Sequence, residues 1–377
     1  MATDTALNTT RRVIKHMYNS ESHGNRLSAR HIKNNGSASV ILDAFFDPGN
    51  RAVRSFREAY YMITGDKHVT GRLNDVEPIT YREAIGSQTL GSVLGDSINR
   101  AMLRDYHNKS QYSIWRKVAS VGQPITDFRT QQRFRVGGYG DLPIVAENTL
   151  YNPLTSPSAD MSSYAVTKRG GTETISLEAI SNDDVGVIQR IPKKMAQAAE
   201  RTLAKFVLNF LKDNPVIYDG DTLFNISHNN LGTAPLSAAS MAVARTALVN
   251  QTEPGSGDPI GEEPATLLVP GELEEVAFNL FQRDTNNDKT FVERMALEII
   301  RVWDWTDPDD WVVAASPDVM PCIEVGFLDG QEDPELFLQD APNTGSMFSN
   351  DELVYKIRHI YGGTVTDFRG LYKSAVI

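Results

Sequence analysis

The chain has 377 residues and carries 37 Lys and Arg against 48 Asp and Glu, which gives a formal net charge of −11. This length allows two to three domains with sizeable cores, and the acidic total excludes a protein that is held on duplex DNA by a generally basic surface. No apolar run reaches the roughly 20 residues that span a bilayer, and the first residues do not begin a secretory signal, so we expect a soluble, intracellular protein without a membrane partner.

The charge is distributed unevenly along the chain. Residues 1–33 hold six basic and two acidic side chains, so this segment is +4 and the remainder is −15. Residues 246–282 and 302–355 contain 7 and 13 acidic side chains and no Lys or Arg. Such a pattern suits a self-assembling protein, because an acidic face can meet the basic arm of a neighbour. The alternative is a solvated acidic surface that keeps the protein soluble.

The first part of the chain, residues 1–126, predicts short helices separated by loops rich in Gly, Asn and Ser. We interpret this region as an arm laid along another structure rather than as a compact domain. The helices are expected where apolar residues recur at three- and four-residue spacing, at residues 11–18, 51–63, 90–106 and 112–121.

After Gln123 the apolar pattern takes the two-residue period of strands. Phe134 and Val136 alternate with Arg133 and Arg135, as in a half-buried strand. About thirty irregular residues then precede the next strands, and an excursion of that length is unusual inside a compact domain. We therefore expect it to project and to bind a neighbouring subunit. The returning strands are predicted at residues 164–166 and 174–180.

The clearest helix is predicted at residues 192–212, after the acidic cap residues 182–184 and before the stop at Asn214-Pro215. At 1.5 Å per residue it spans about 31 Å, and its apolar face is expected at Ile191, Met195, Ala199, Phe206 and Phe210. A mixed α/β region follows, with helices expected at residues 237–251 and 271–281 and strands at 266–269 and 296–302. The last region predicts strands at 322–327 and 335–338, a loop at 341–350, and a strand pair over residues 353–373 broken at Gly362-Gly363.

Motifs for catalysis, cofactors or metals are missing from the sequence. It contains no glycine-rich phosphate-binding loop, and its histidines lack zinc spacing. Asp284-Thr-Asn286-Asn-Asp288 starts like a calcium loop, but the glycine and the closing glutamate of that motif are absent. The one cysteine, Cys322, excludes an intrachain disulfide and is expected to be a buried structural thiol. We expect no catalytic residue, no cofactor and no metal.

One acidic and aromatic cluster, residues 303–311, resembles the composition of a sugar-cleaving site. A single proline-containing loop does not place two carboxylates across a scissile bond, so we expect a solvent-facing hairpin anchored by Trp303 and Trp311. A carboxylate-dependent hydrolase stays open as an alternative, and it requires the segment Asp304–Asp310 to face a pocket.

The order of segments from about Ser87 onward resembles the major capsid proteins of tailed phages, specifically the Mu-like major head subunit family. The resemblance rests on the order of the segments, since no single motif is diagnostic. It covers about three quarters of the chain. Residues 38–85 more weakly resemble the stretch that joins the capsid and protease parts of fused relatives. The matching stretches are residues 90–100, 180–185, 229–234, 265–270 and 361–373.

The resemblance implies an α+β fold of the Hong Kong 97 type. In that fold the long irregular stretch between the predicted strands is an extended loop that lies over a neighbouring subunit. The helix at 192–212 is the spine helix of a peripheral domain. The implied parts are an N-terminal arm and lead-in (1–126), the extended loop (127–175), the spine helix of the peripheral domain (176–215), an axial domain (216–316) and the return strands of the peripheral domain (317–377).

The implied function is structural, not enzymatic. Copies of the chain would form pentamers and hexamers of an icosahedral shell around double-stranded phage DNA, assembled in the host cytoplasm and found in the virion. Scaffold, portal and decoration proteins are implied partners, and the DNA would be contacted without sequence specificity. An encapsulin-like compartment that encloses enzyme cargo shares the fold and stays open as an alternative.

Candidate contact residues follow from the charge pattern and the implied parts. On the extended loop we expect Arg133, Arg135, Lys168 and Arg169 to contact a neighbouring subunit, and on the arm we expect Arg11, Arg12 and Lys15 to meet acidic surface or packaged DNA. Reversing Arg133 and Arg135 to Glu is expected to impair assembly and to leave monomer folding intact. Some relatives cross-link a loop lysine to an asparagine, for which Lys168, Asn343 and Asn350 are candidates, but the sequence places no catalytic carboxylate for that reaction.

Overall fold

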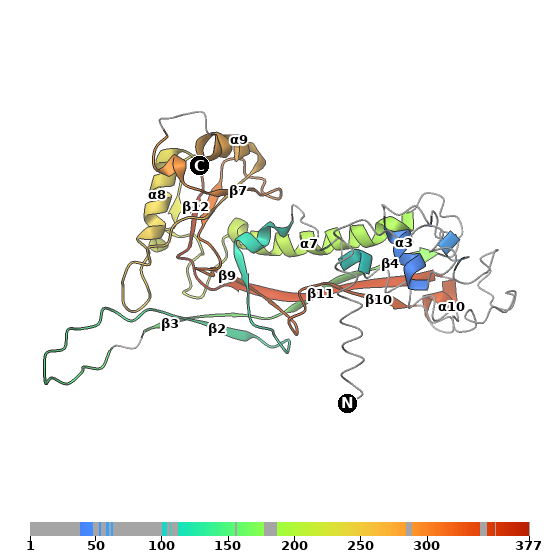
Figure 1. The fold of residues 1–377 in the computed structure, drawn as a ribbon, viewed down its shortest axis with the longest axis horizontal. Helices are drawn as coiled ribbons and strands as arrows, with labels where there is room; N and C mark the ends of the chain where they lie inside the picture. Colours follow the sequence, from blue (N-terminus) through green and yellow to red (C-terminus); the bar gives the residue numbers. More distant parts are fainter. Residues whose placement is uncertain are drawn as a thin grey trace. The chain divides into compact units, whose positions relative to one another are not determined.

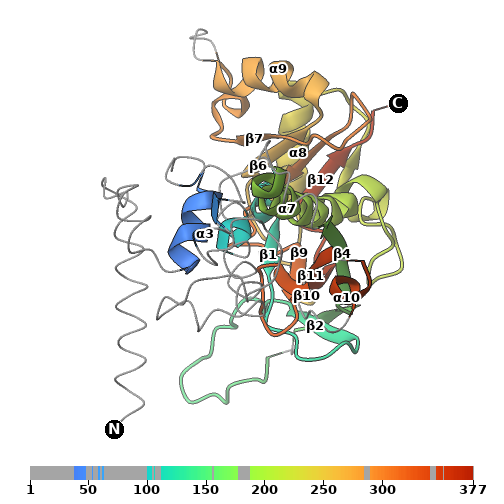
Figure 2. The ribbon, with the colours of Figure 1, turned by 90° about the vertical axis from the view of Figure 1, so that its right-hand side faces the viewer.

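A computed structural model describes the chain in segments that mix helices with sheets (Figures 1 and 2). By their internal contacts the residues divide into two compact units, one made of Met1–Asp105, Thr172–Met195 and Leu336–Ile357, the other of Tyr106–Gly171, Ala196–Glu335 and Arg358–Ile377. No described helix combines the length and the apolar character needed to cross a membrane. The described residues are 38–47, 53, 58–59, 62, 100–103, 106, 112–154, 157–176, 187–283, 289–339, 345–350 and 352–376.

The first unit has an apolar cluster around helix α3 (Ala38–Phe46). Leu42 and Phe45 of α3 are buried there together with Ile175 of strand β4 (Thr167–Ser176) and Tyr355 of strand β11 (Glu352–Val365). The helix predicted at residues 11–18 lies outside the described residues. Those predicted at 51–63 and 90–106 lie mostly outside them, although residues 58–59, 62, 100–103 and 106 are helical.

One five-stranded sheet contains the returning strands that the sequence predicts. Its order is β1-β9-β11-β10, and β4 also pairs with β11. Strand β1 runs parallel to β9, whereas β11 runs antiparallel to it. The remaining bounds are Ala119–Val121 for β1, Ile323–Phe327 for β9 and Glu335–Gln339 for β10.

A second five-stranded sheet has the order β5-β12-β8-β6-β7. Strands β6 and β8 are buried along their whole length, because both of their faces are covered. Leu267 and Val313 pack in one cluster with helix α8 (Ala238–Val249), whereas Leu268 and Val312 pack into the main core. The Ser237 hydroxyl caps α8 by accepting from the Ser240 backbone N–H at 3.1 Å. The other bounds are Leu231–Gly232 for β5, Thr266–Val269 for β6, Glu298–Arg301 for β7, Trp311–Ala314 for β8 and Leu371–Ser374 for β12, with Glu274–Ala277 for the short helix α9.

The long helix α7 spans Val187–Asp213, 27 residues, and therefore starts earlier than predicted. Pro192 lies inside it, where the missing N–H leaves one intrahelical hydrogen bond unmade. The predicted apolar stripe through Met195 and Phe206 is only partly buried. The buried stripe is displaced by one residue, through Ala196 and Val207, and packs into the main core with Trp115.

Within the described residues the predicted helices and strands mostly agree with the structure, and several differ from it. Residues 113–117 form a 3₁₀ helix, but 119–121 form strand β1 instead of continuing the helix. Strand β3 (Ala159–Tyr164) begins earlier than residue 164. Strand β8 is not among the predicted strands. The predicted loop at 341–350 contains helix α10 (Ser346–Asn350).

The expected break at Gly362-Gly363 does not occur, since β11 runs through both glycines. A Cβ at Gly362 would collide with the backbone of Ala165, and one at Gly363 with the backbone of Glu324. The glycines therefore allow close approach of neighbouring strands rather than a turn. The chain turns instead at residues 366–370, and β11 and β12 belong to different sheets.

His359 of β11 is buried and its Nε2 lies 2.9 Å from the backbone carbonyl of Glu332. Since a carbonyl only accepts, Nε2 carries a proton and donates it. The ring also stacks on Phe327, with centroids 5.7 Å apart. Burial lowers the pKa of His359 to about 4, so the ring is neutral at pH 7.

This histidine makes stability depend on pH. The unfolded chain binds a proton at His359 near pH 6.5, whereas the folded chain does so only near pH 4. Stability is therefore lost as the pH falls from about 6.5 to 4, by up to about 3 kcal/mol. Denaturant unfolding at pH 7 and 4.5 checks this, because the pH dependence should shrink in His359→Gln. An equal loss in both proteins would show that other groups cause it.

Candidate assembly surface

Strands β2 (Gln131–Val136) and β3 form an antiparallel hairpin, and its register gives it two different faces. Arg135 lies opposite Asp160, and Phe134 lies opposite Met161. Because successive side chains of a strand point to opposite sides, the two arginines share one face and the apolar residues share the other. The alternation predicted for residues 133–136 is confirmed.

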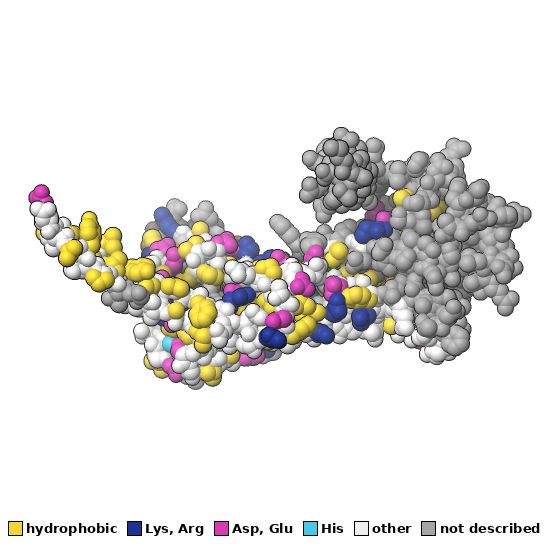
Figure 3. Space-filling view, turned by 90° about the horizontal axis from the view of Figure 1, so that it is seen from below, with side chains coloured by type: hydrophobic (Ala, Val, Ile, Leu, Met, Phe, Trp, Pro, Cys, Tyr) yellow, Lys and Arg dark blue, Asp and Glu magenta, His cyan; other side chains and the backbone are white. Residues whose placement is uncertain are grey.

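The apolar face of the hairpin is open to solvent. Phe134 is 61% exposed, and Val136 and Met161 are exposed as well. In Figure 3 hydrophobic side chains gather along one segment at the left of the view. Single exposed apolar residues are ordinary, whereas a contiguous set on one strand pair marks an interaction surface.

The loop that joins β2 to β3 extends this apolar surface. Ile144 is fully exposed, at 101% of its reference area, and the segment contains no Lys or Arg. None of these residues is among the predicted contact residues, although apolar side chains in a long proline-containing loop are a signal that the sequence carries. We call the following set the apolar hairpin: Phe134, Val136, Tyr139, Leu142, Ile144, Leu150, Tyr151, Leu154 and Met161.

The charged face of the hairpin is turned toward its own chain. The Arg133 guanidinium lies 2.5 Å from a Glu324 carboxylate oxygen on β9. The Tyr164 hydroxyl donates to the same oxygen at 2.7 Å. Burial and this hydrogen bond raise the pKa of Tyr164, so the phenol stays protonated and remains a donor. The end of the hairpin is thereby joined to the five-stranded sheet.

A second group of charges holds the hairpin where its loop begins. Arg135 pairs with Asp367, which is 1% exposed, and also with Glu253 at 3.2 Å. Arg369 lies 3.0 Å from both Asp160 and Asp367. We call Arg135, Asp160, Glu253, Asp367 and Arg369 the root cluster. It ties β2 and β3 to the turn between β11 and β12.

Lys168 and Arg169 on β4 also have partners within the chain. The Arg169 guanidinium donates to the Tyr361 carbonyl at 2.8 Å and lies over the Tyr361 ring at 4.1 Å. The Lys168 ammonium lies 5.0 Å from the Phe128 ring centroid. Contact of these cations with a neighbouring subunit stays a prediction. Arg11, Arg12, Lys15 and Asn343 lie outside the described residues.

The ion pairs of Arg133 and Arg135 correct one expectation. Reversal of both to Glu would place new carboxylates against Glu324 and Asp367. Like charges at such sites destabilise the fold, and a buried unpaired charge is costly. The double reversal therefore affects folding as well as assembly, and it does not separate the two.

In the cluster at residues 303–311, the first and the last aspartate have separate partners. Asp304 pairs with Lys205 at 2.6 Å, and Asp310 pairs with Lys373 at 2.9 Å. The two carboxylates are thus paired with separate lysines. Trp311 is buried as predicted, whereas Trp303 is only partly buried, against Tyr112.

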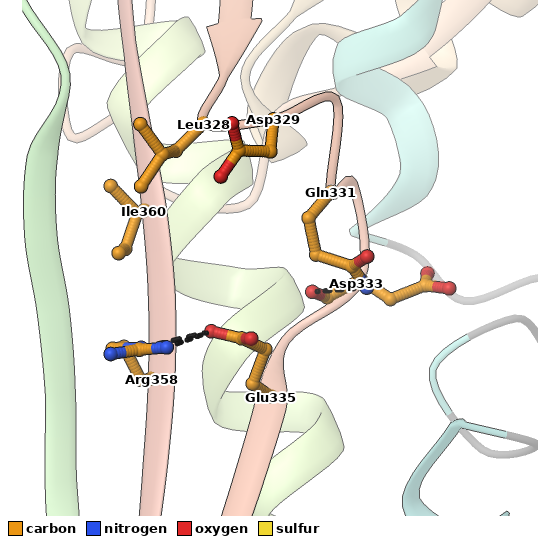
Figure 4. Close-up of a pocket in the computed structure, with 7 residues that line it drawn as sticks. All are labelled: Leu328, Asp329, Gln331, Asp333, Glu335, Arg358 and Ile360. Carbon is orange, nitrogen blue, oxygen red and sulfur yellow. Dashed lines mark hydrogen bonds and ion pairs between the residues drawn. The ribbon is translucent and has the colours of Figure 1, made fainter. Parts of the chain in front are cut away.

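A small pocket beside β9 and β11 contains further carboxylates (Figure 4). Glu335 is paired with Arg358 at 2.7 Å, and the carboxylate of Asp333 points away from this pair. Among the described residues, no group of three His, Cys, Asp or Glu side chains is placed to hold a metal. Cys322 is buried, and burial raises the pKa of its thiol to about 12, as expected for a structural thiol.

Comparison with known proteins gives one family and a set of similar structures. Residues 160–374, more than half of the chain, match the family model described as phage capsid protein. A solved structure from Mycobacterium phage Cain is 12% identical, with a TM-score of 0.46 over 71% of this chain and 89% of that one. A structure of the capsid of an empty GTA particle, computed with C5 symmetry, is 13% identical, with a TM-score of 0.47 over 71% and 91%. No curated protein sequence matches the chain.

Proposed function

The chain belongs to the phage capsid protein family, and we propose that it is the major head subunit, which self-assembles as pentamers and hexamers into an icosahedral shell around double-stranded phage DNA. The apolar hairpin carries this proposal, because a contiguous exposed apolar surface of this kind needs a covering partner. In a shell of identical subunits the partner is the next copy of the chain.

The two faces of the hairpin have different roles in assembly. Its charged face is paired inside the chain through Glu324 and Asp367, so the hairpin is fixed at its base before a neighbour arrives. Its apolar face is left for the neighbour. A patch that binds a different patch on the next copy makes a heterologous contact, and such contacts build rings and extended lattices. Many weak contacts per subunit then stabilise the shell collectively.

The fold we propose is of the Hong Kong 97 type, in a Mu-like subunit. Helix α7 lies within the segment proposed as the spine of the peripheral domain (176–215), and the β2–β3 hairpin lies within the proposed extended loop (127–175). The sheet formed by β6, β7 and β8 supports an axial domain at 216–316. Residues 1–126 are proposed as the arm and lead-in, and 317–377 as the return strands.

The proposed partners are those of a virion protein: other copies of the chain, scaffold, portal and decoration proteins, and packaged DNA contacted without sequence specificity. Assembly would take place in the host cytoplasm. The family match favours a phage head over an encapsulin-like compartment. The separate pairing of Asp304 and Asp310 argues against a hydrolase built on that loop.

Electron microscopy of the purified full-length chain tests the proposal. Closed shells of uniform diameter are expected once the concentration exceeds the assembly threshold, because collective contacts make assembly cooperative. A chain that stays monomeric, or forms a small oligomer with enzymatic turnover, would contradict it. Shells that contain host enzymes instead of phage DNA would favour the compartment.

A further inference from the structure

Helix α7 presents basic side chains on an exposed face. Arg190, Lys193, Lys194 and Arg201 are exposed, in a chain whose net charge is −11. At 3.6 residues per turn, the spacing of Arg190, Lys194 and Arg201 puts them on one side of the helix, over about 16 Å of its length. Lys193 flanks the same side. We call these four residues the α7 basic stripe.

The stripe stands out because its cations are unpaired. Most described Lys and Arg side chains have an ion pair, a hydrogen bond or a ring beneath them, as Lys205 does with Asp304 and Arg301 with Glu274. Within the described part of the chain, the cations without such a partner are Arg129 and the four residues of the stripe. A stripe of unpaired charge is therefore concentrated on one helix.

The arrangement is unfavourable for the isolated helix. Like charges four residues apart repel each other, as at Arg190 and Lys194. The first turns of a helix favour acidic side chains because of the macrodipole, yet the first turn of α7 contains none. A bound polyanion would relieve both effects, since it supplies negative charge along the whole stripe.

We infer that the α7 basic stripe is a contact surface for the phosphate backbone of the packaged double-stranded DNA, an inference that rests on the proposed head function. Along the helix axis Arg190 and Lys194 lie about 6 Å apart, and Lys194 and Arg201 about 10 Å apart. Such a row of point charges suits phosphates, which form an extended line of negative charge. The alternative partner is the acidic surface of a neighbouring subunit, and shell formation by a variant that lacks the stripe distinguishes the two. The contact is electrostatic and independent of DNA sequence.

The salt dependence of DNA binding measures this surface directly. Unassembled full-length chain is titrated into a 30-base-pair duplex of arbitrary sequence, and fluorescence anisotropy gives the affinity between 50 and 200 mM salt. The slope of log affinity against log salt falls by about 0.9 for each phosphate contact removed. The test variant is Arg190→Gln, Lys193→Gln, Lys194→Gln. Its matched control removes the same charge from exposed but paired cations: Arg116→Gln, Lys117→Gln, Arg301→Gln.

We expect the test variant to lose about 2.7 from the magnitude of the slope, and the control to keep the wild-type slope. Equal losses in both variants would show that only net charge matters and would overturn the inference. Failure of the wild-type chain to bind the duplex would also overturn the inference. So would a test variant that binds DNA normally but no longer forms shells, because that result would assign the stripe to a contact with a neighbouring subunit. Shell formation by the wild type is scored separately by electron microscopy, so a failure of the head function is recognised on its own.

Discussion

Replacing Ile144 with Asp is expected to abolish shell assembly and to leave the free energy of unfolding of the subunit within about 0.5 kcal/mol of wild type. Ile144 is fully exposed in the chain itself, so the substitution removes no contact from the folded subunit. In the assembled shell the same side chain would be covered by a neighbour, and a carboxylate there would lose its water without gaining a partner. Sedimentation velocity and chemical denaturation measure the two quantities.

The matched control is Ile226→Asp, since Ile226 is also exposed but lies outside the apolar hairpin. We expect the control to assemble. If Ile144→Asp assembled as readily as wild type, the apolar hairpin would not be the assembly element. Equal failure of both variants would point to added negative charge as the cause.

Replacing Asp367 with Ala is expected to destabilise the subunit by about 3 kcal/mol, which is the scale for removing one partner of a buried ion pair. Asp367 is buried and forms ion pairs with both Arg135 and Arg369. Without it, the two guanidiniums are left close together in a partly buried site, with Asp160 and Glu253 as the remaining acids of the root cluster. Denaturant unfolding monitored by tryptophan fluorescence gives the change.

Glu335→Gln is the comparison for this prediction. Glu335 also pairs with an arginine, Arg358, but both side chains are more than a third exposed. Surface pairs of this kind contribute about 0–1 kcal/mol. A loss at Asp367 no larger than the loss at Glu335 would mean that the root cluster does not hold the hairpin in place.

The alternation of Arg133, Phe134, Arg135 and Val136 was enough to predict a strand, but not which of its faces is covered. Burial in a strand pair depends on what lies against each face, and the partners Glu324 and Asp367 are remote in the sequence. The sequence therefore predicts that the arginines contact a neighbour, whereas the structure pairs them within the chain and leaves the apolar residues exposed. Their contact with another subunit stays a prediction.

Partners that are remote in the sequence also explain the other differences between the prediction and the structure. Gly362 and Gly363 indicate a turn when read locally, yet they permit close packing against backbone that only the folded sheet brings near. The buried face of α7 differs by one residue from the predicted apolar face. Phe206 and Phe210 suggest a core face, whereas smaller residues such as Ala196 and Ala204 face the core. Helix α8 and strands β6, β7, β9 and β10 were predicted well, because their patterns depend on near neighbours in the sequence.

A cryo-electron microscopy reconstruction of the assembled particle tests the central claim most directly. The side chains of the apolar hairpin, from Phe134 through Ile144 to Met161, should be buried against a neighbouring subunit, while Arg133 and Arg135 keep their partners within the chain. A shell in which this hairpin stays exposed to solvent, or a purified chain that forms no shell, would contradict the account.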